Sequence, residues 1–245
     1  MNILRIDILA VSITLAAMVV LALQVDAQEQ SYDLRIEGVT GRVKSIEEFE
    51  ATITLSNGVA KESSRSLSRV VRFDKTGRKT YEWSQISGMD AIERFYSYDE
   101  NKRSTRTLRA GPRSVETHSY SIFSFDIANN TLNEKVFPGR EEERRKQTQG
   151  YTFRFDTNGC LAEEIMLTAD NKPLLKKVYI YENDCLPSEL RIGHASGVGR
   201  IQVLKYAYEM DDNGNWKKQT IENTLANTEA TKKREVIYRK LKYYR

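Results

Sequence analysis

The stretch that decides the fold is Val70-Val71-Arg72-Phe73-Asp74-Lys75-Thr76-Gly77-Arg78-Lys79-Thr80-Tyr81. Apolar and polar residues alternate before Asp74, and they alternate again after Gly77. Alternation interrupted by Asp and Gly is typical of a β-hairpin, because Asp hydrogen-bonds to the turn backbone and Gly adopts a positive φ without steric cost. We therefore predict two antiparallel strands joined by a turn at Asp74 to Gly77.

Weaker copies of this stretch follow it along the chain. They are Phe95-Tyr96-Ser97-Tyr98-Asp99, Phe123-Ser124-Phe125-Asp126, Phe153-Arg154-Phe155-Asp156, Tyr179-Ile180-Tyr181-Glu182 and Tyr206-Ala207-Tyr208-Glu209-Met210-Asp211. The acidic residue thus recurs six times, at intervals of 25 to 30 residues. Such a loose period is typical of hairpins whose far loops differ in length.

The repeats predict an all-β fold, an antiparallel meander of a dozen or more strands. An open twisted sheet rarely exceeds about 10 strands without curling, so we expect a strongly curved or rolled sheet. Its concave face should carry aromatic residues from five of the six copies, namely Phe73, Tyr98, Phe125, Phe155 and Tyr181. These rings either pack as a core or form a stacking platform for a glycan or another planar ligand, and the sequence leaves both readings open.

The segment from Arg72 to Thr80 resembles the aromatic-Asp-x-x-Gly-Arg-x-Thr core of the YD-repeat, or Rhs-type, family of bacterial surface and secreted proteins. The resemblance covers roughly residues 70 to 220. This chain departs from the pattern where Lys102, Asn129 and Cys185 replace Gly and Glu182 replaces Asp. The resemblance implies an exported β-repeat protein and, by analogy alone, a toxin-associated or immunity factor.

Residues 1–27 have the features of a secretory signal peptide: Arg5, an apolar run from Ile8 to Leu23, and Val25-Asp26-Ala27 as a small-residue cleavage site. The apolar run is shorter than the ~20 residues of a spanning helix, so we expect cleavage and no membrane span afterwards. Residues 28–245 then form a single β-repeat domain that is secreted or periplasmic. Cleavage leaves 37 basic and 32 acidic residues, a mild formal charge of +5 that does not suggest a nucleic-acid partner.

Cys160 and Cys185 are the two cysteines, and each lies at or just after the turn of a neighbouring copy. Equivalent positions of adjacent hairpins lie close together, and an exported protein meets an oxidising compartment. We therefore propose a disulfide; the alternative is two separate thiols.

No catalytic or metal-binding set is visible. The adjacent carboxylates are Glu47-Glu48, Glu163-Glu164 and Asp211-Asp212. Neighbouring side chains of a strand point to opposite faces, so a pair on a strand cannot converge on one glycosidic bond. Asp211-Asp212 lies in a turn, where acidic residues are common. Residues 211 to 222 match a calcium loop in part, but Trp216 stands where that loop requires Gly. Only His118 and His194 could contribute imidazole ligands, and no motif implies a cofactor.

Residues 232–245 form the most basic aromatic stretch. Val236, Tyr238, Lys240 and Lys242 share one strand face, while Ile237, Arg239, Leu241 and Tyr243 share the other. We interpret the stretch as an edge strand whose lysines discourage edge-to-edge pairing. The alternative is a contact with an anionic surface.

These observations predict an exported, non-enzymatic β-repeat protein that binds or scaffolds at the cell envelope or outside the cell, with a glycan or an envelope protein as partner. The first alternative is an envelope-active glycan hydrolase whose acidic residues meet across strands. The second is the toxin-associated or immunity role.

Overall fold

The computed structural model describes residues 32–39, 41–56, 59–85, 89–111, 114–141, 145–182, 185–225 and 233–244. They contain one short helix, α2 (Tyr32–Ile36), and a 15-stranded sheet. The strands are β1 (Val43–Ser56), β2 (Val59–Glu62), β3 (Ser66–Phe73), β4 (Lys79–Ser84), β5 (Ile92–Asp99), β6 (Lys102–Arg109), β7 (Val115–Asp126), β8 (Thr131–Pro138), β9 (Gln149–Phe155), β10 (Leu161–Thr168), β11 (Pro173–Tyr181), β12 (Pro187–His194), β13 (Gln202–Met210), β14 (Trp216–Leu225) and β15 (Lys233–Tyr243). The predicted signal peptide, residues 1–27, lies outside the described residues. Within the described ranges, no helix has the length and apolar character needed to cross a bilayer.

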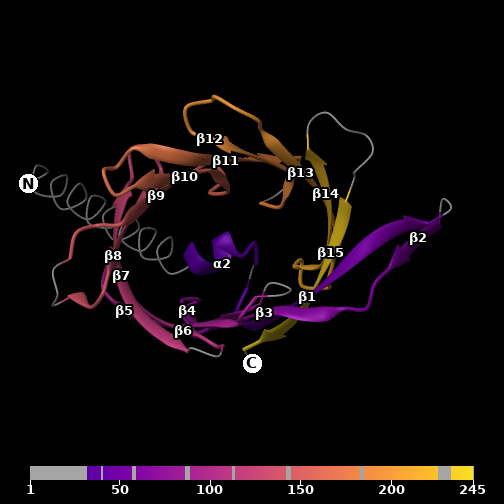
Figure 1. Cartoon of the computed structure of the whole chain (residues 1–245), viewed down its shortest axis with the longest axis horizontal. Helices are drawn as coiled ribbons and strands as arrows, with labels where there is room; N and C mark the ends of the chain where they lie inside the picture. The colour runs from indigo at the N-terminus through magenta and orange to yellow at the C-terminus, as the bar shows by residue number, and fades with distance from the viewer. Residues whose placement is uncertain are drawn as a thin grey trace, which may run out of the picture.

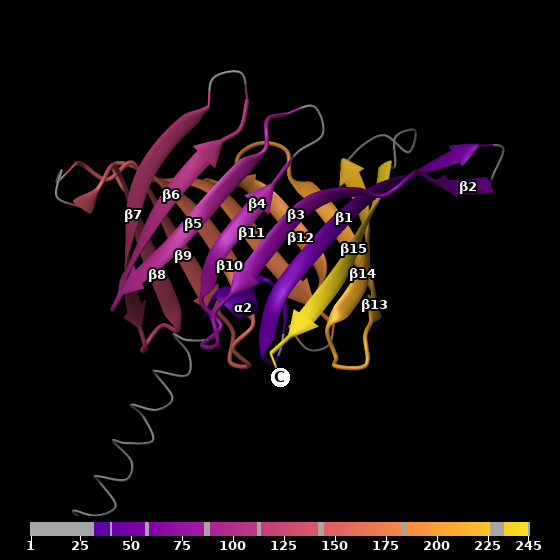
Figure 2. The same cartoon turned by 90° about the horizontal axis from the view of Figure 1, so that it is seen from below.

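The sheet closes into a barrel (Figure 1). Strands β3 to β15 pair antiparallel in chain order, and β1 pairs with both β3 and β15. Because β2 pairs only with the far end of β1, the ring consists of the other 14 of the 15 strands. The predicted all-β antiparallel meander is confirmed, and the rolled sheet is a closed barrel whose strands are tilted (Figure 2).

The repeated acidic residue builds the turns at one end of the barrel. The carboxylate of Asp74 accepts hydrogen bonds from the backbone N–H groups of Thr76 (2.8 Å) and Arg78 (3.1 Å). Asp156 and Asp211 repeat the arrangement with the residues two and four positions further on. Gly occupies the positive-φ position of all three turns, with φ of 87°, 78° and 75°. The motif is therefore a local solution for turning a hairpin.

Two clusters of buried apolar residues lie inside the barrel. One joins Val39, which follows α2, to residues of β1 and β3, and its members are Val39, Val43, Ile46, Val71 and Phe73. The other consists of Leu132, Phe153 and Phe155, with Phe123, Phe125, Tyr151 and Leu161 packed against it. The first cluster fixes the chain that leads out of α2 to the inner wall.

The C-terminal strand is not an edge strand, so that interpretation was wrong. Strand β15 pairs with β14 on one side and with β1 on the other, from Val43↔Tyr243 to Ile53↔Arg234. The basic residues of the strand lie on different faces. Arg239 is buried inside the barrel, whereas Lys240 and Lys242 are exposed. Local sequence could not reveal this, because the pairing joins the two ends of the chain.

Candidate functional site: the barrel lumen

Helix α2 lies inside the barrel, beside the wall formed by β3 to β6 (Figures 1 and 2). Its Asp33 is buried and accepts hydrogen bonds from the backbone N–H of Lys79 (2.8 Å) and the hydroxyl of Tyr98 (2.6 Å). The guanidinium of Arg103 lies 3.7 Å from the other carboxylate oxygen. A helix of five residues is not stable by itself, so these contacts with the wall fix its position.

Glu37, which follows α2, is the centre of the interior. Both of its carboxylate oxygens accept hydrogen bonds from Arg69, at 2.6 and 2.7 Å, and Lys79 donates to one of them at 2.8 Å. Arg239, from the last strand, donates to the backbone carbonyl of Glu37 at 2.6 Å. Burial alone would raise the pKa of Glu37, but Lys79, Arg69 and Arg239 outweigh it and hold that pKa well below its usual value.

The charges around Glu37 balance. The carboxylates are Asp33, Glu37, Glu48, Glu82 and Glu134, and the cations are Arg69, Lys79, Arg94, Arg103 and Arg239. We call these ten side chains the plug network. Typical links are Glu48–Arg239 at 2.7 Å and Glu134–Arg103 at 2.6 Å. Every carboxylate in it has a cationic partner within 4 Å, so the network holds the segment around α2 in place.

The opposite wall of the lumen has a different character. Residues that pair directly across two strands have their side chains on the same face of the sheet. Glu134 faces the lumen and pairs with Tyr151, so the inward-facing residues can be traced from strand to strand until they reach Arg239, which also faces the lumen. The inward-facing residues of β9 to β15 include Tyr151, Met166, Leu175, Tyr179, Tyr181, Leu190, Ile192, Leu204, Tyr206, Tyr208, Ile221 and Ile237. We call this surface the tyrosine wall. Except for the buried Leu190, its side chains are only half-buried.

The tyrosine hydroxyls of this wall are mostly engaged along the wall itself. Tyr179 donates to Glu164 (3.1 Å), Tyr181 to the carbonyl of Leu161 (2.5 Å), and Tyr208 to the carbonyl of Pro187 (2.9 Å). Burial raises the pKa of Tyr208 to about 12, and burial followed by the charge of Glu164 raises that of Tyr179 further. These phenols therefore remain neutral at physiological pH. The wall offers the lumen ring faces and aliphatic side chains. Its polar residues Glu164, Lys177 and Gln219 bond to one another or to the tyrosines.

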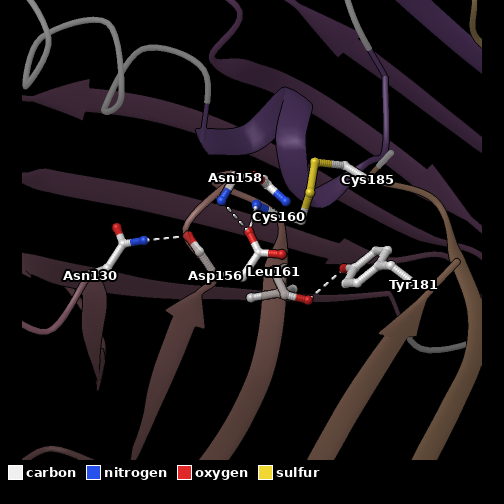
Figure 3. The surroundings of a disulfide bond; sticks show 7 residues. All are labelled: Asn130, Asp156, Asn158, Cys160, Leu161, Tyr181 and Cys185. Atoms are coloured by element: carbon white, nitrogen blue, oxygen red, sulfur yellow. Dashed lines mark hydrogen bonds between the residues drawn. A yellow bond between two sulfur atoms is a disulfide. The ribbon is translucent and has the colours of Figure 1, made fainter. Parts of the chain in front are cut away.

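A disulfide fastens two turns next to this wall (Figure 3). Cys160 and Cys185, which the sequence analysis paired, are joined by an S–S bond of 2.03 Å with their Cα atoms 5.0 Å apart. Cys160 is buried, and its N–H donates to Asp156 at 2.8 Å. The chain after α2 passes close by, because a Cβ atom on Gly38 would lie 3.6 Å from the side chain of Leu186. The disulfide thus links the β9–β10 and β11–β12 turns close to the chain segment that follows α2.

The five aromatic residues singled out from the sequence fall into two groups. Phe73, Phe125 and Phe155 belong to the two apolar clusters. Tyr98 holds α2 through Asp33, and Tyr181 lies on the tyrosine wall. They do not form one continuous stacking platform. Tyr206 and Tyr208 of β13 belong to a copy of the repeat motif but were not among the five predicted rings. Asp33 and Glu37 were not predicted, because no local sequence signal marks them.

The other sequence candidates are dispersed. In the pair Glu47-Glu48, Glu48 is buried in the plug network, whereas Glu47 binds the exposed Lys242 at 3.2 Å. Glu163 contacts Lys176, and Glu164 contacts Lys177. Asp211 is used by its own turn and by the hydroxyl of Tyr243. His118 bonds to Glu116, and His194 bonds to Ser196. Over the described ranges, no three His, Cys, Asp or Glu side chains come together as metal ligands.

Comparisons with known proteins were made for the family, the sequence and the fold. No family model matches the chain, and no curated protein matches it. Among solved structures, it is similar to a porin-like protein from Bacteroides vulgatus, with 11% identity and a TM-score of 0.43, over 83% of this chain and 99% of the other. It is also similar to a porin-like protein from Bacteroides uniformis, with 11% identity and a TM-score of 0.41, over 83% of this chain and 99% of the other. A DUF1329 family protein from Desulfovibrio piger has 11% identity and a TM-score of 0.31, over 89% of this chain and 91% of the other.

The assignment to the YD-repeat, or Rhs-type, family was wrong. No family model matches the chain. The physical reason lies in the turns: the motif that carried the resemblance specifies a carboxylate bonded to two backbone N–H groups and a Gly at positive φ. Any β-hairpin with this turn selects the same residues.

Proposed function

We propose that this protein is a non-enzymatic binding protein that holds an amphiphilic ligand, with a substantial apolar part, against the tyrosine wall. The observation that carries the proposal is the asymmetry of the lumen. The plug network and the Val39 cluster join the α2 segment to β1, β3 to β6, β8 and β15, whereas Leu204, Tyr206 and Ile221 of β13 and β14 remain half-buried. Barrels with more than about eight strands are wide enough to enclose a ligand.

The energetics favour an apolar occupant of the tyrosine wall. Covering about 200 Å² of apolar surface contributes roughly 5 kcal/mol, before the costs of association are subtracted. The tyrosine hydroxyls of Tyr179, Tyr181 and Tyr208 already have partners in the wall. A ligand that covers their rings therefore leaves none of these three hydroxyls unpaired. A strongly polar ligand would gain few hydrogen bonds there, which makes a glycan the weaker of the two candidates.

The compartment proposed is extracytoplasmic. A disulfide persists in secreted and periplasmic proteins and is rare in the cytosol, and Cys160 and Cys185 are bonded. The N-terminal sequence features of residues 1–27 support the same compartment.

We further propose that the outer face of the barrel is surrounded by water. A lipid-facing barrel needs an apolar outer band about 25 Å tall. Here outward positions of successive strands carry exposed charges, among them Arg72, Arg106, Lys135, Arg154, Arg191, Lys205 and Lys240. Such side chains cost about 2 to 4 kcal/mol each at the middle of a bilayer.

The test of the proposed function is ligand binding by the purified protein. A fluorescent apolar probe such as N-phenyl-1-naphthylamine should bind, and a long-chain fatty acid should displace it. The variant Leu204→Asn should weaken binding about tenfold, because it removes apolar surface from the lumen. Val203→Asn is the matched control, since the neighbouring side chain points outward. Failure of the probe to bind, or equal loss in both variants, would refute the proposal. Binding of a member of a glycan panel in place of the probe would support the glycan alternative.

A further inference from the structure

A groove on the outer face of the barrel is separate from the lumen. It has a volume of about 490 Å³ and lies over β5, β6 and β7, which run side by side in Figure 2. Phe95, Arg106, His118 and Tyr120 line it from the strands, and Arg140 and Glu141 line it from the segment that follows β8. Cavities of about 300 to 1,000 Å³ are the usual size of small-molecule sites.

The floor of the groove is aromatic and rigid. The guanidinium of Arg106 lies over the ring of Phe95, 4.5 Å from its centroid. Tyr120 is buried and stacks on Phe137, with ring centroids 4.8 Å apart and an interplanar angle of 8°. Cross-strand pairing places Phe95, Arg106 and His118 in one row across the three strands. A planar group entering the groove therefore meets an aromatic surface that is already fixed.

The charges of the groove leave two arginines available. Glu141 is taken by Lys102 at 2.6 Å, and Glu116, the acidic neighbour of His118, binds that histidine at 2.9 Å. Arg106 and Arg140 are exposed, and neither has a carboxylate partner within the part of the chain that the structure describes. A guanidinium presents a planar fork of N–H donors that matches the two oxygens of a carboxylate or phosphate.

We propose that this groove binds a small organic anion, a planar ring that bears a phosphate or a carboxylate. The ring packs on the floor beside Phe95, and the anionic group lies between Arg106 and Arg140. His118 adds a further polar group to the same rim. This site is independent of the tyrosine wall, because strand pairing puts Phe95 and Arg106 on the outer face and Tyr96 on the inner face.

The experiment is a calorimetric titration of the purified protein with phenyl phosphate, benzoate and the neutral benzyl alcohol. Both anions should bind, and benzyl alcohol should bind at least tenfold more weakly. The stronger of the two anions identifies the preferred group. Arg106→Gln and Arg140→Gln should each raise the dissociation constant about tenfold. Arg109→Gln is the matched control, because it is an exposed arginine of the same strand that does not line the groove.

Two results would overturn the proposal. One is binding of benzyl alcohol as tight as that of the anions, which would mean that charge plays no part. The other is an unchanged dissociation constant in both variants of the groove arginines. The thermal midpoint of each variant establishes that it is folded. Retained binding of the apolar lumen probe by Arg106→Gln separates this site from the proposed lumen function, so that either can fail without the other.

Discussion

Replacing Glu37 by Gln tests whether the plug network holds the N-terminal segment in the barrel. The substitution keeps the shape of the side chain and removes one of five negative charges, so Arg69 and Lys79 lose their shared carboxylate partner. Removing one member of a buried ion pair typically costs about 3 to 5 kcal/mol. We expect the lower end of this range here, because Arg69 and Lys79 keep Glu82 as a partner. At about 2 to 4 °C per kcal/mol for a domain of this size, a loss of 3 kcal/mol lowers the thermal midpoint by roughly 6 to 12 °C.

The assay is denaturant and thermal unfolding, combined with hydrogen exchange at the amides of Glu37 and Val39, which donate to carbonyls of the α2 segment. Glu47→Gln is the control, since its ion pair with Lys242 is exposed and is worth less than about 1 kcal/mol. Adding Lys79→Met to Glu37→Gln should recover part of the loss, because it removes a buried cation that keeps only Glu82, at 3.4 Å, as its partner. The reasoning is refuted if Glu37→Gln leaves both the midpoint and the exchange rates within the range of the Glu47→Gln control.

The remaining predictions concern acid, the disulfide and one turn. Because its pKa is lowered in the folded protein, the ionised Glu37 contributes fully to folding stability above its usual pKa of 4.5. This contribution is lost as the pH falls through the folded-state pKa. When the pH is lowered from 7 to 3, the unfolding midpoint should therefore fall more steeply in the wild type than in Glu37→Gln. Reducing Cys160–Cys185, which closes a loop of 25 residues, should cost about 3.5 kcal/mol, and thiol labelling should modify neither cysteine before reduction. Asp211→Ala removes the acceptor of two turn N–H groups and should cost about 1 to 2 kcal/mol, whereas Ca²⁺ should leave the thermal midpoint of the wild type unchanged.

The parts of the fold that are encoded locally could be read from the sequence. The Asp74 turn depends on residues within four positions of each other, and the alternation in β15 correctly put Arg239 and Leu241 on one face. What could not be read depends on distant residues. Arg239 reaches Glu37 across 202 positions, and closure of the ring pairs Val43 with Tyr243.

The candidate sites show the same division. A run of alternating aromatic residues predicts an inner face, and Tyr181, one of the five predicted rings, lies on it. Tyr208 also lies there but was not among the predicted rings. No pattern in the sequence indicates that α2 lies inside the barrel and covers part of the inner face. Its five residues, Tyr32–Ile36, have neither a cap nor an apolar period and resemble a loop. Arg140 is likewise an ordinary loop residue until the fold brings it to Arg106.

The seam between β1 and β15 determines the order in which the molecule can be assembled. Its two strands are the first and the last of the ring, so the final hydrogen bonds wait for the last residues of the chain. Contacts of such high sequence separation are slow to form. Until β15 pairs with β1, the sheet has two unpaired edge strands. The segment around Glu37 can then reach the inner face of the open sheet from the side. We therefore expect the wall to close around the α2 segment late in folding, and a chain shortened before β15 to expose both edge strands to self-association.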